Sequence, residues 1–168
     1  MQRFTKVVKD KRHYIKSAID NVIFPNLKGD WKELAIETRD YIKYYVVDQI
    51  QGFGRYNKET YTSHFSVPLW ALRRGDSTEY FEYYVAHELA HAFVNCIYRP
   101  QRVQAHGETY YKVFKAICPE HLQPYEYSYK PRNAKKYGII RDISKEEKVE
   151  EWRLNEKENK KWYLKLVT

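Results

Sequence analysis

Residues 84–94 form a mostly apolar stretch that contains two histidines and one glutamate, and this stretch constrains the fold more than any other part of the chain. Apolar residues flank His87, Glu88 and His91 on both sides, and turn residues lie before and after the stretch. The sequence therefore predicts a buried helix over about residues 77–98. Burying polar side chains costs free energy unless they find partners, so the fold must provide partners for all three.

The three polar residues form a His-Glu-x-x-His pattern. On a helix, His87 and His91 project from the same face, and two imidazoles placed in this way bind one Zn²⁺ at about 2.0–2.1 Å each. Glu88 is displaced around the helix, so it reaches a water on the ion without being a ligand. Zinc lowers the pKa of such a water to about 7, and a carboxylate accepts its proton as it attacks a peptide carbonyl. The pattern predicts a zinc hydrolase with Glu88 as the general base.

A catalytic zinc site needs a third protein ligand and one open coordination position. A metzincin would have Gly at position 94 and His at position 97, but this chain has Val94 and Ile97, which excludes that class. His106 is the strongest candidate, because it follows the predicted helix after a short loop and precedes a glycine. Glu108 and Glu120 are alternatives, as in zinc enzymes with a glutamate ligand. The other histidines are expected to be surface or hydrogen-bonded residues: His13, His64 and His121.

The remaining hydrophobic periodicity predicts mostly helices with one small sheet. Apolar residues at helical spacing favour helices over residues 4–23, 30–46 and 107–117, while alternation over 61–67 indicates a strand that pairs with a short strand near 55–57. The expected fold class is α+β: a mainly helical, zincin-like metalloprotease domain with a small antiparallel sheet next to the active-site helix. If the longer strand is an exposed edge beside the cleft, an extended substrate can add to it as a further strand.

The chain of 168 residues carries 30 Lys and Arg against 22 Asp and Glu, a net charge of +8. A basic protein favours acidic partners such as nucleic acid. The sequence has no apolar run of about 18 residues, and its charged N-terminus does not resemble a secretory signal, so we expect neither a membrane span nor export. Two isolated cysteines, Cys96 and Cys118, indicate reduced thiols and a cytoplasmic protein.

Positive charge is concentrated between Tyr127 and Arg141, where five cations and no acid are interleaved with tyrosines. Lysines and arginines neutralise phosphates, and tyrosines stack on unpaired bases at roughly 1–3 kcal/mol each. This segment is therefore the predicted nucleic-acid contact; a solvated, flexible loop is the alternative interpretation. The residues assigned to the contact are Lys130, Arg132, Lys135, Lys136 and Arg141.

Taken together, these motifs resemble the SprT-like (Spartan-type) zinc metalloprotease domain over about residues 30–120. The resemblance rests on Val85–Phe93, on His106–Tyr110 with Val113 and Phe114 after it, and on the strand at 65–70. It implies zinc ligands and a catalytic base, and the best understood members of the family cleave proteins crosslinked to, or bound on, DNA. The Cys-x-x-Cys zinc ribbon that is common in bacterial members is absent from this sequence. The implied ligands are His87, His91 and His106, and the implied base is Glu88.

We therefore expect a metalloprotease core over residues 1–125, and a basic Tyr- and Lys-rich segment with a charged helix over 126–168, packed on or appended to that core. The expected activity is that of a zinc-dependent endopeptidase acting on DNA-bound proteins, as a monomer, in the cytoplasm, at the nucleoid or in the nucleus. One alternative is a non-catalytic DNA-binding or protein-inhibiting module with a structural zinc, and another is a regulatory metalloprotease that cuts one specific partner. The sequence assigns no oxyanion donor; Tyr110, Tyr111 and Arg99 are candidates only.

Overall fold

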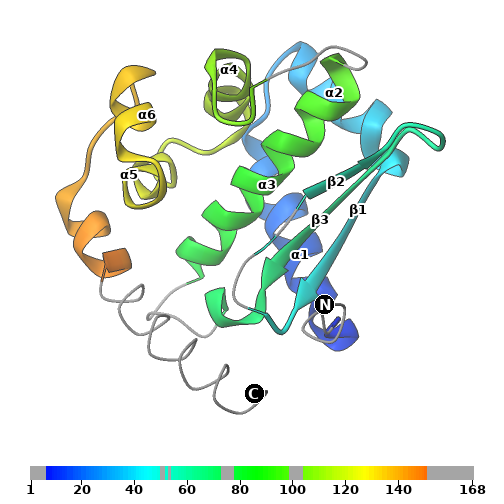
Figure 1. Cartoon of the computed structure of the whole chain (residues 1–168), viewed down its shortest axis with the longest axis horizontal. Coiled ribbons are helices and arrows are strands. Elements are labelled where there is room, and N and C mark those ends of the chain that lie inside the picture. Colours follow the sequence, from blue (N-terminus) through cyan, green and yellow to red (C-terminus); the bar gives the residue numbers. More distant parts are fainter. Residues whose placement is uncertain (1–6, 50–51, 53, 73–77, 99–103, 151–168) are drawn as a thin grey trace.

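The computed structural model describes residues 7–49, 52, 54–72, 78–98 and 104–150. Over these residues the chain is mainly helical with one three-stranded sheet, which confirms the α+β class (Figure 1). The α-helices are α1 (Arg12–Ala18), α2 (Asp30–Thr38), α3 (Glu79–Tyr98), α4 (Glu108–Ile117), α5 (Glu126–Tyr129) and α6 (Pro131–Lys136), and residues 143–150 are also helical. The strands are β1 (Ile42–Val47), β2 (Gly54–Asn57) and β3 (Thr62–Pro68).

The sheet has the order β1-β3-β2, with β1 parallel and β2 antiparallel to β3. The sheet is therefore mixed, and the expectation of a purely antiparallel sheet is wrong. The expected pairing of the strand at 61–67 with a strand near 55–57 is confirmed as the β2–β3 pair. The longer strand could be an exposed edge or an ordinary core strand, and the structure shows the second, because β3 lies between two partners. In the described sheet, the two edge strands are β1 and β2, and β2 directly precedes β3 in the sequence.

The prediction of one helix over residues 30–46 holds for its first half only. The helix α2 ends at Thr38, and after a short turn the chain extends as β1. The β1 sequence, Ile-Lys-Tyr-Tyr-Val-Val, consists largely of β-branched and aromatic residues, which fit a pleated, half-buried surface. Its backbone groups pair along β3, from Ile42 opposite Ser63 to Val47 opposite Pro68, and this pairing overrides the local helical spacing.

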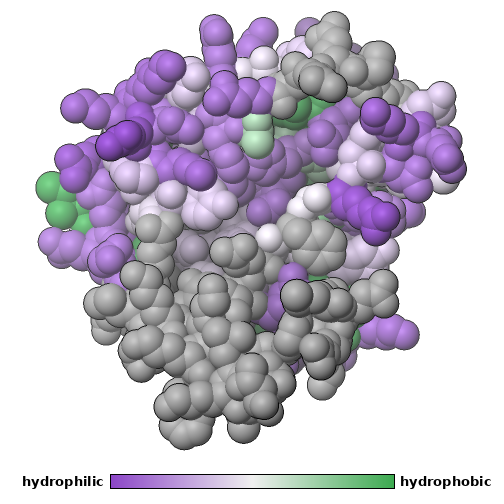
Figure 2. Space-filling model, in the orientation of Figure 1, coloured by the Kyte–Doolittle hydropathy of each residue, from purple (hydrophilic) through white to green (hydrophobic). Residues whose placement is uncertain are grey.

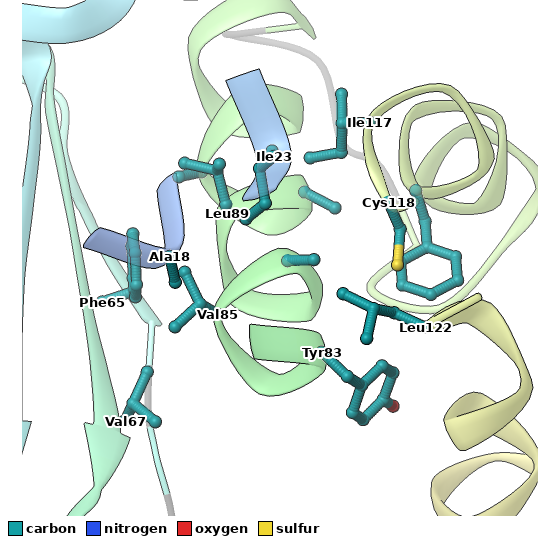
Figure 3. Close-up of a cluster of buried hydrophobic side chains, with 14 of the residues drawn as sticks. Ala18, Ile23, Phe65, Val67, Tyr83, Val85, Leu89, Ile117, Cys118 and Leu122 are labelled. Carbon is teal, nitrogen blue, oxygen red and sulfur yellow. The ribbon is translucent and has the colours of Figure 1, made fainter. Parts of the chain in front are cut away.

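Helix α3 runs through the middle of the molecule, between the sheet and α4 (Figure 1). In Figure 3, Phe65 and Val67 of β3 approach α3 from one side, while Ile117 and Leu122 approach it from the other. A helix that is apolar almost all round is stable only when it is covered on several sides, which explains why α3 is central. The core thus holds the His-Glu-x-x-His helix in place along most of its length.

The segment after residue 125 also belongs to this hydrophobic core. Ala134, Ile139 and Val149 are almost completely buried in it, and the Glu126 side chain is fully buried. The described residues from 126 to 150 are therefore packed on the rest of the chain, whereas residues 151–168 of the expected second part lie outside the described residues. Within the described part of the chain, no helix combines the length and apolar character needed to cross a membrane.

Candidate metal centre

Three imidazoles converge at one point between α3 and the start of α4. His87 and His91 come from one face of α3, and His106 lies in the turn before α4. The Nε2 atom of His106 lies 3.2 Å from Nε2 of His91 and 3.3 Å from Nε2 of His87. The predicted third histidine is therefore brought to the other two, although it is 15 residues from His91 in the chain.

The spacing of these nitrogens fits a shared metal ion. Two ligands that are each about 2.0–2.1 Å from a tetrahedral ion lie about 3.4 Å apart, close to both distances. Hydrogen bonding alone cannot satisfy the arrangement, because one imidazole nitrogen has either one proton or one lone pair to offer, and Nε2 of His106 faces two partners. His87, His91 and His106 could thus hold one metal ion, with a coordination position left for another group.

Glu126, a residue that the sequence analysis did not identify, lies directly behind His87. Its carboxylate is 2.8 Å from Nδ1 of His87, accepts a 2.7 Å hydrogen bond from the Tyr111 hydroxyl, and accepts a short one from the Tyr83 hydroxyl. With a partner on Nδ1, the His87 ring presents Nε2 to the other two histidines. Carboxylates that fix a metal-binding histidine in this way orient the ring and raise its basicity.

The pKa values of the histidines follow from this arrangement. Burial alone lowers the pKa of His87, but the charge and hydrogen bond of Glu126 outweigh burial, so this pKa is raised above its ordinary value. Burial and the positive potential of His87 lower the pKa of His91 to about 2 and that of His106 to about 4. Two of the three imidazoles are thereby kept in the neutral form that binds a metal.

Glu88 is buried next to His87. Burial raises the pKa of its carboxyl group above the ordinary range, and the nearby His87 opposes this shift only in part. Its side chain lines a cavity of about 10 Å³ together with His87, Tyr84 and Tyr129, a volume that suits about one water molecule. Glu88 is therefore buried next to His87 and is not one of the three residues that could hold the ion.

The edge strand β2 begins beside Glu88, and Gly52, two residues before β2, lies against Tyr84. A Cβ atom added to Gly54, the first residue of β2, would lie 4.0 Å from Oε2 of Glu88. The backbone N–H of Gly52 donates a 2.9 Å hydrogen bond to the Tyr84 hydroxyl, which fixes the approach of β2 to α3. A side chain at Gly52 would collide with the backbone oxygen of Ser66 at 2.3 Å, so this close approach requires glycine.

The turn that carries His106 is held from two sides. The side-chain amide of Asn133 in α6 donates a 3.0 Å hydrogen bond to the backbone oxygen of His106. The Tyr110 ring in α4 stacks on His91 at a centroid distance of 4.3 Å, and its hydroxyl donates to the backbone oxygen of His87. The same Tyr110 ring lies edge-on to His106 at a centroid distance of 5.2 Å, so His106 contacts both α4 and α6.

The other histidines and the alternative ligands lie elsewhere. Glu108 and Glu120 are exposed, and neither belongs to the His cluster found among the described residues. His64 is half-buried and faces the Tyr45 hydroxyl at 3.5 Å, while His13 and His121 are exposed.

The start of the predicted nucleic-acid segment, at Tyr129 and Lys130, lies beside the histidines, while most of the assigned cations lie on α6. The Lys130 ammonium lies 5.4 Å from the centre of the Tyr129 ring, which in turn lies against His87. Arg132, Lys135 and Lys136 are exposed on α6, in a region where Figure 2 shows mainly hydrophilic side chains. Arg141 points elsewhere: its Nε donates to both carboxylate oxygens of Glu146.

Comparison with known proteins identified no relative: no family model, no curated protein and no solved structure matches this chain. The resemblance to the SprT-like family stays a prediction that rests on the motifs.

Proposed function

We propose that the chain is a zinc-dependent endopeptidase of SprT-like, zincin-like character. The observation that carries the proposal is the convergence of His87, His91 and His106, with Glu88 and His87 lining one small cavity. Three histidine ligands with an open position are typical of catalytic zinc, whereas structural zinc sites have four protein ligands. The geometry thus favours catalysis over the alternative of a non-catalytic module with a structural zinc.

Each residue of the site has a defined part in peptide hydrolysis. A bound zinc ion would supply a Lewis acid that polarises the scissile carbonyl and acidifies water. Glu88 accepts the proton of the attacking water and delivers it to the leaving amine; its raised pKa suits a group that must take and then release a proton. Glu126 holds the His87 ring in the orientation that binds the ion.

The substrate is proposed to bind as an extended chain along β2. Within the described sheet β2 pairs on one side only, with β3, and its first residue lies next to Glu88. A strand added at this edge would run past the metal centre and would be held by backbone hydrogen bonds, which give little sequence preference. This mode replaces the expected addition to the strand at 61–67.

DNA-bound or DNA-crosslinked proteins are the proposed substrates, in the cytoplasm, at the nucleoid or in the nucleus. The support is the position of the basic segment: Lys130 lies over the Tyr129 ring, which contacts His87, and three exposed cations follow on α6. Phosphates bound there would bring a DNA-bound protein to the site.

Replacing Glu88 by Gln tests the proposal. The zinc-loaded wild-type chain is expected to cleave an unfolded protein such as casein, and the variant is expected to retain zinc and fold but lose cleavage. Cleavage that is equal in the two proteins would contradict the proposal. Addition of DNA to the wild-type reaction separates the substrate classes: cleavage of one specific protein, unaffected by DNA, would favour the regulatory protease.

A further inference from the structure

Helix α5 places two side chains against the His87 ring. Glu126 and Tyr129 are three residues apart, so they lie on one face of this short helix. Glu126 is fully buried and contacts Nδ1 of His87, whereas Tyr129 is 46% exposed and its ring centre lies 4.9 Å from that of His87. The Tyr129 ring also lies 5.8 Å from His106. Tyr129 therefore stands at the solvent side of the metal centre.

Three tyrosines donate hydrogen bonds behind the histidines: Tyr83, Tyr110 and Tyr111. The Tyr83 and Tyr111 hydroxyls donate to Glu126, and the Tyr110 hydroxyl donates to the backbone oxygen of His87. All three side chains are almost completely buried, so a substrate cannot reach them. This excludes Tyr110 and Tyr111 as oxyanion donors, and Arg99 lies outside the described residues.

Tyr129 faces the same small cavity as the general base. The cavity of about 10 Å³ is lined by Glu88 from α3 and by Tyr129 from α5, together with Tyr80, Tyr83, Tyr84 and His87 of α3. A carbonyl group that approaches from solvent would thus meet the base on α3 and a phenol on α5. The Lys130 ammonium, 5.4 Å from the Tyr129 ring centre, adds positive charge at the same rim.

We infer that Tyr129 is a catalytic residue whose hydroxyl donates a hydrogen bond to the scissile carbonyl oxygen as negative charge develops on it. The inference rests on the proposed peptidase function and adds to it the oxyanion donor that the sequence did not assign. Hydrolysis adds water across the C–N bond: the nucleophile's proton passes through Glu88 to the amine, and Tyr129 stabilises the oxygen without transferring its own proton. Donors placed where charge develops stabilise the transition state more than the bound substrate.

The first test compares Tyr129→Phe with Tyr127→Phe in the zinc-loaded full chain. The Tyr127 hydroxyl belongs to the same helix but donates to the backbone oxygen of Ile139, so its loss is a matched control. Tyr129→Phe is expected to lower kcat by roughly 10²–10³-fold with KM changed less than twofold, while zinc content stays at the wild-type level. A kcat that is equal in Tyr129→Phe and Tyr127→Phe would overturn the inference.

The second test measures binding instead of turnover, and it separates this inference from the proposed function. A phosphinic peptide, which imitates the tetrahedral transition state, is expected to bind zinc-loaded Tyr129→Phe at least tenfold more weakly than wild type. A substrate peptide is expected to bind with equal affinity to the single variant Glu88→Gln, which does not cleave it, and to the double variant that also carries Tyr129→Phe. Equal phosphinic affinity in wild type and Tyr129→Phe would overturn the role of Tyr129. Absence of cleavage by the wild type, with the affinity difference intact, would instead overturn the peptidase function.

Discussion

The carboxylate of Glu126 lies 2.8 Å from Nδ1 of His87, although the two residues are 39 positions apart in the chain. This contact turns the opposite nitrogen of His87 toward His106 and links the segment after residue 125 to the metal centre. A substitution at Glu126 is therefore expected to change the metal affinity while all three histidines are still present.

Replacing Glu126 by Gln is expected to weaken zinc binding by about 10- to 100-fold, because the amide cannot match the carboxylate in orienting His87 and raising its basicity. Competition with a chromophoric chelator measures the affinity. Glu79→Gln is a suitable control, since Glu79 also accepts a tyrosine hydrogen bond, from Tyr125, and lies about two helical turns before His87 on α3. An affinity that is equal in the two variants would exclude the proposed role of Glu126.

The pH dependence of zinc binding is expected to report one competing proton, not three. The pKa values of His91 and His106 are lowered to about 2 and about 4, so both imidazoles are neutral at pH 5, whereas the pKa of His87 is raised and its ring is protonated there. Between pH 5 and 6 the logarithm of the apparent zinc affinity should rise by about one unit per pH unit. A slope near three, measured with a metal buffer, would show that all three rings are protonated in the metal-free protein.

Gly52→Ala is expected to lower the free energy of unfolding by about 1–3 kcal/mol, because the added methyl group would overlap the Ser66 backbone oxygen. It should also lower activity, since the segment leading into β2 must move away from Tyr84. Gly54→Ala is the matched control: the nearest atom to its added methyl group is 4.0 Å away. Urea unfolding of the two variants decides between them, and equal stabilities would show that the close approach at Gly52 is not required.

Leu89→Ala is expected to destabilise the fold by about 2–5 kcal/mol, because it leaves a cavity where α3 is covered by the rest of the core. Ile36→Ala removes a similar volume from an exposed side chain on α2 and should change stability by less than about 0.5 kcal/mol. Thermal unfolding compares them. A small loss at Leu89 would mean that α3 is not packed as described.

The sequence predicted the parts of the site that depend on local spacing. His87, Glu88 and His91 are fixed relative to one another by the helix, and His106 follows after a short loop, so a pattern within one segment was enough to place them. Glu126 and Tyr129 could not be placed in this way, because their positions depend on how α5 packs against α3. One signal was present at Glu126: a single carboxylate within the mostly apolar stretch 122–127 would need a buried partner.

The sheet was predicted less well, for a similar reason. Apolar residues in 42–47 suit both a helix face and a strand, and the choice is made by pairing with β3, which begins 15 residues after β1 ends. Because β1 pairs with β3 in parallel, β3 is internal in the described sheet. The edge at which we propose that a substrate strand adds is therefore β2.

Metal analysis of the purified chain tests the central claim most directly. We expect one zinc ion per wild-type chain, loss of that zinc in His106→Ala, and full retention in His121→Ala, which changes an exposed histidine outside the cluster. A wild-type chain without bound metal, or a His106→Ala variant that keeps its zinc, would contradict the metal centre formed by His87, His91 and His106.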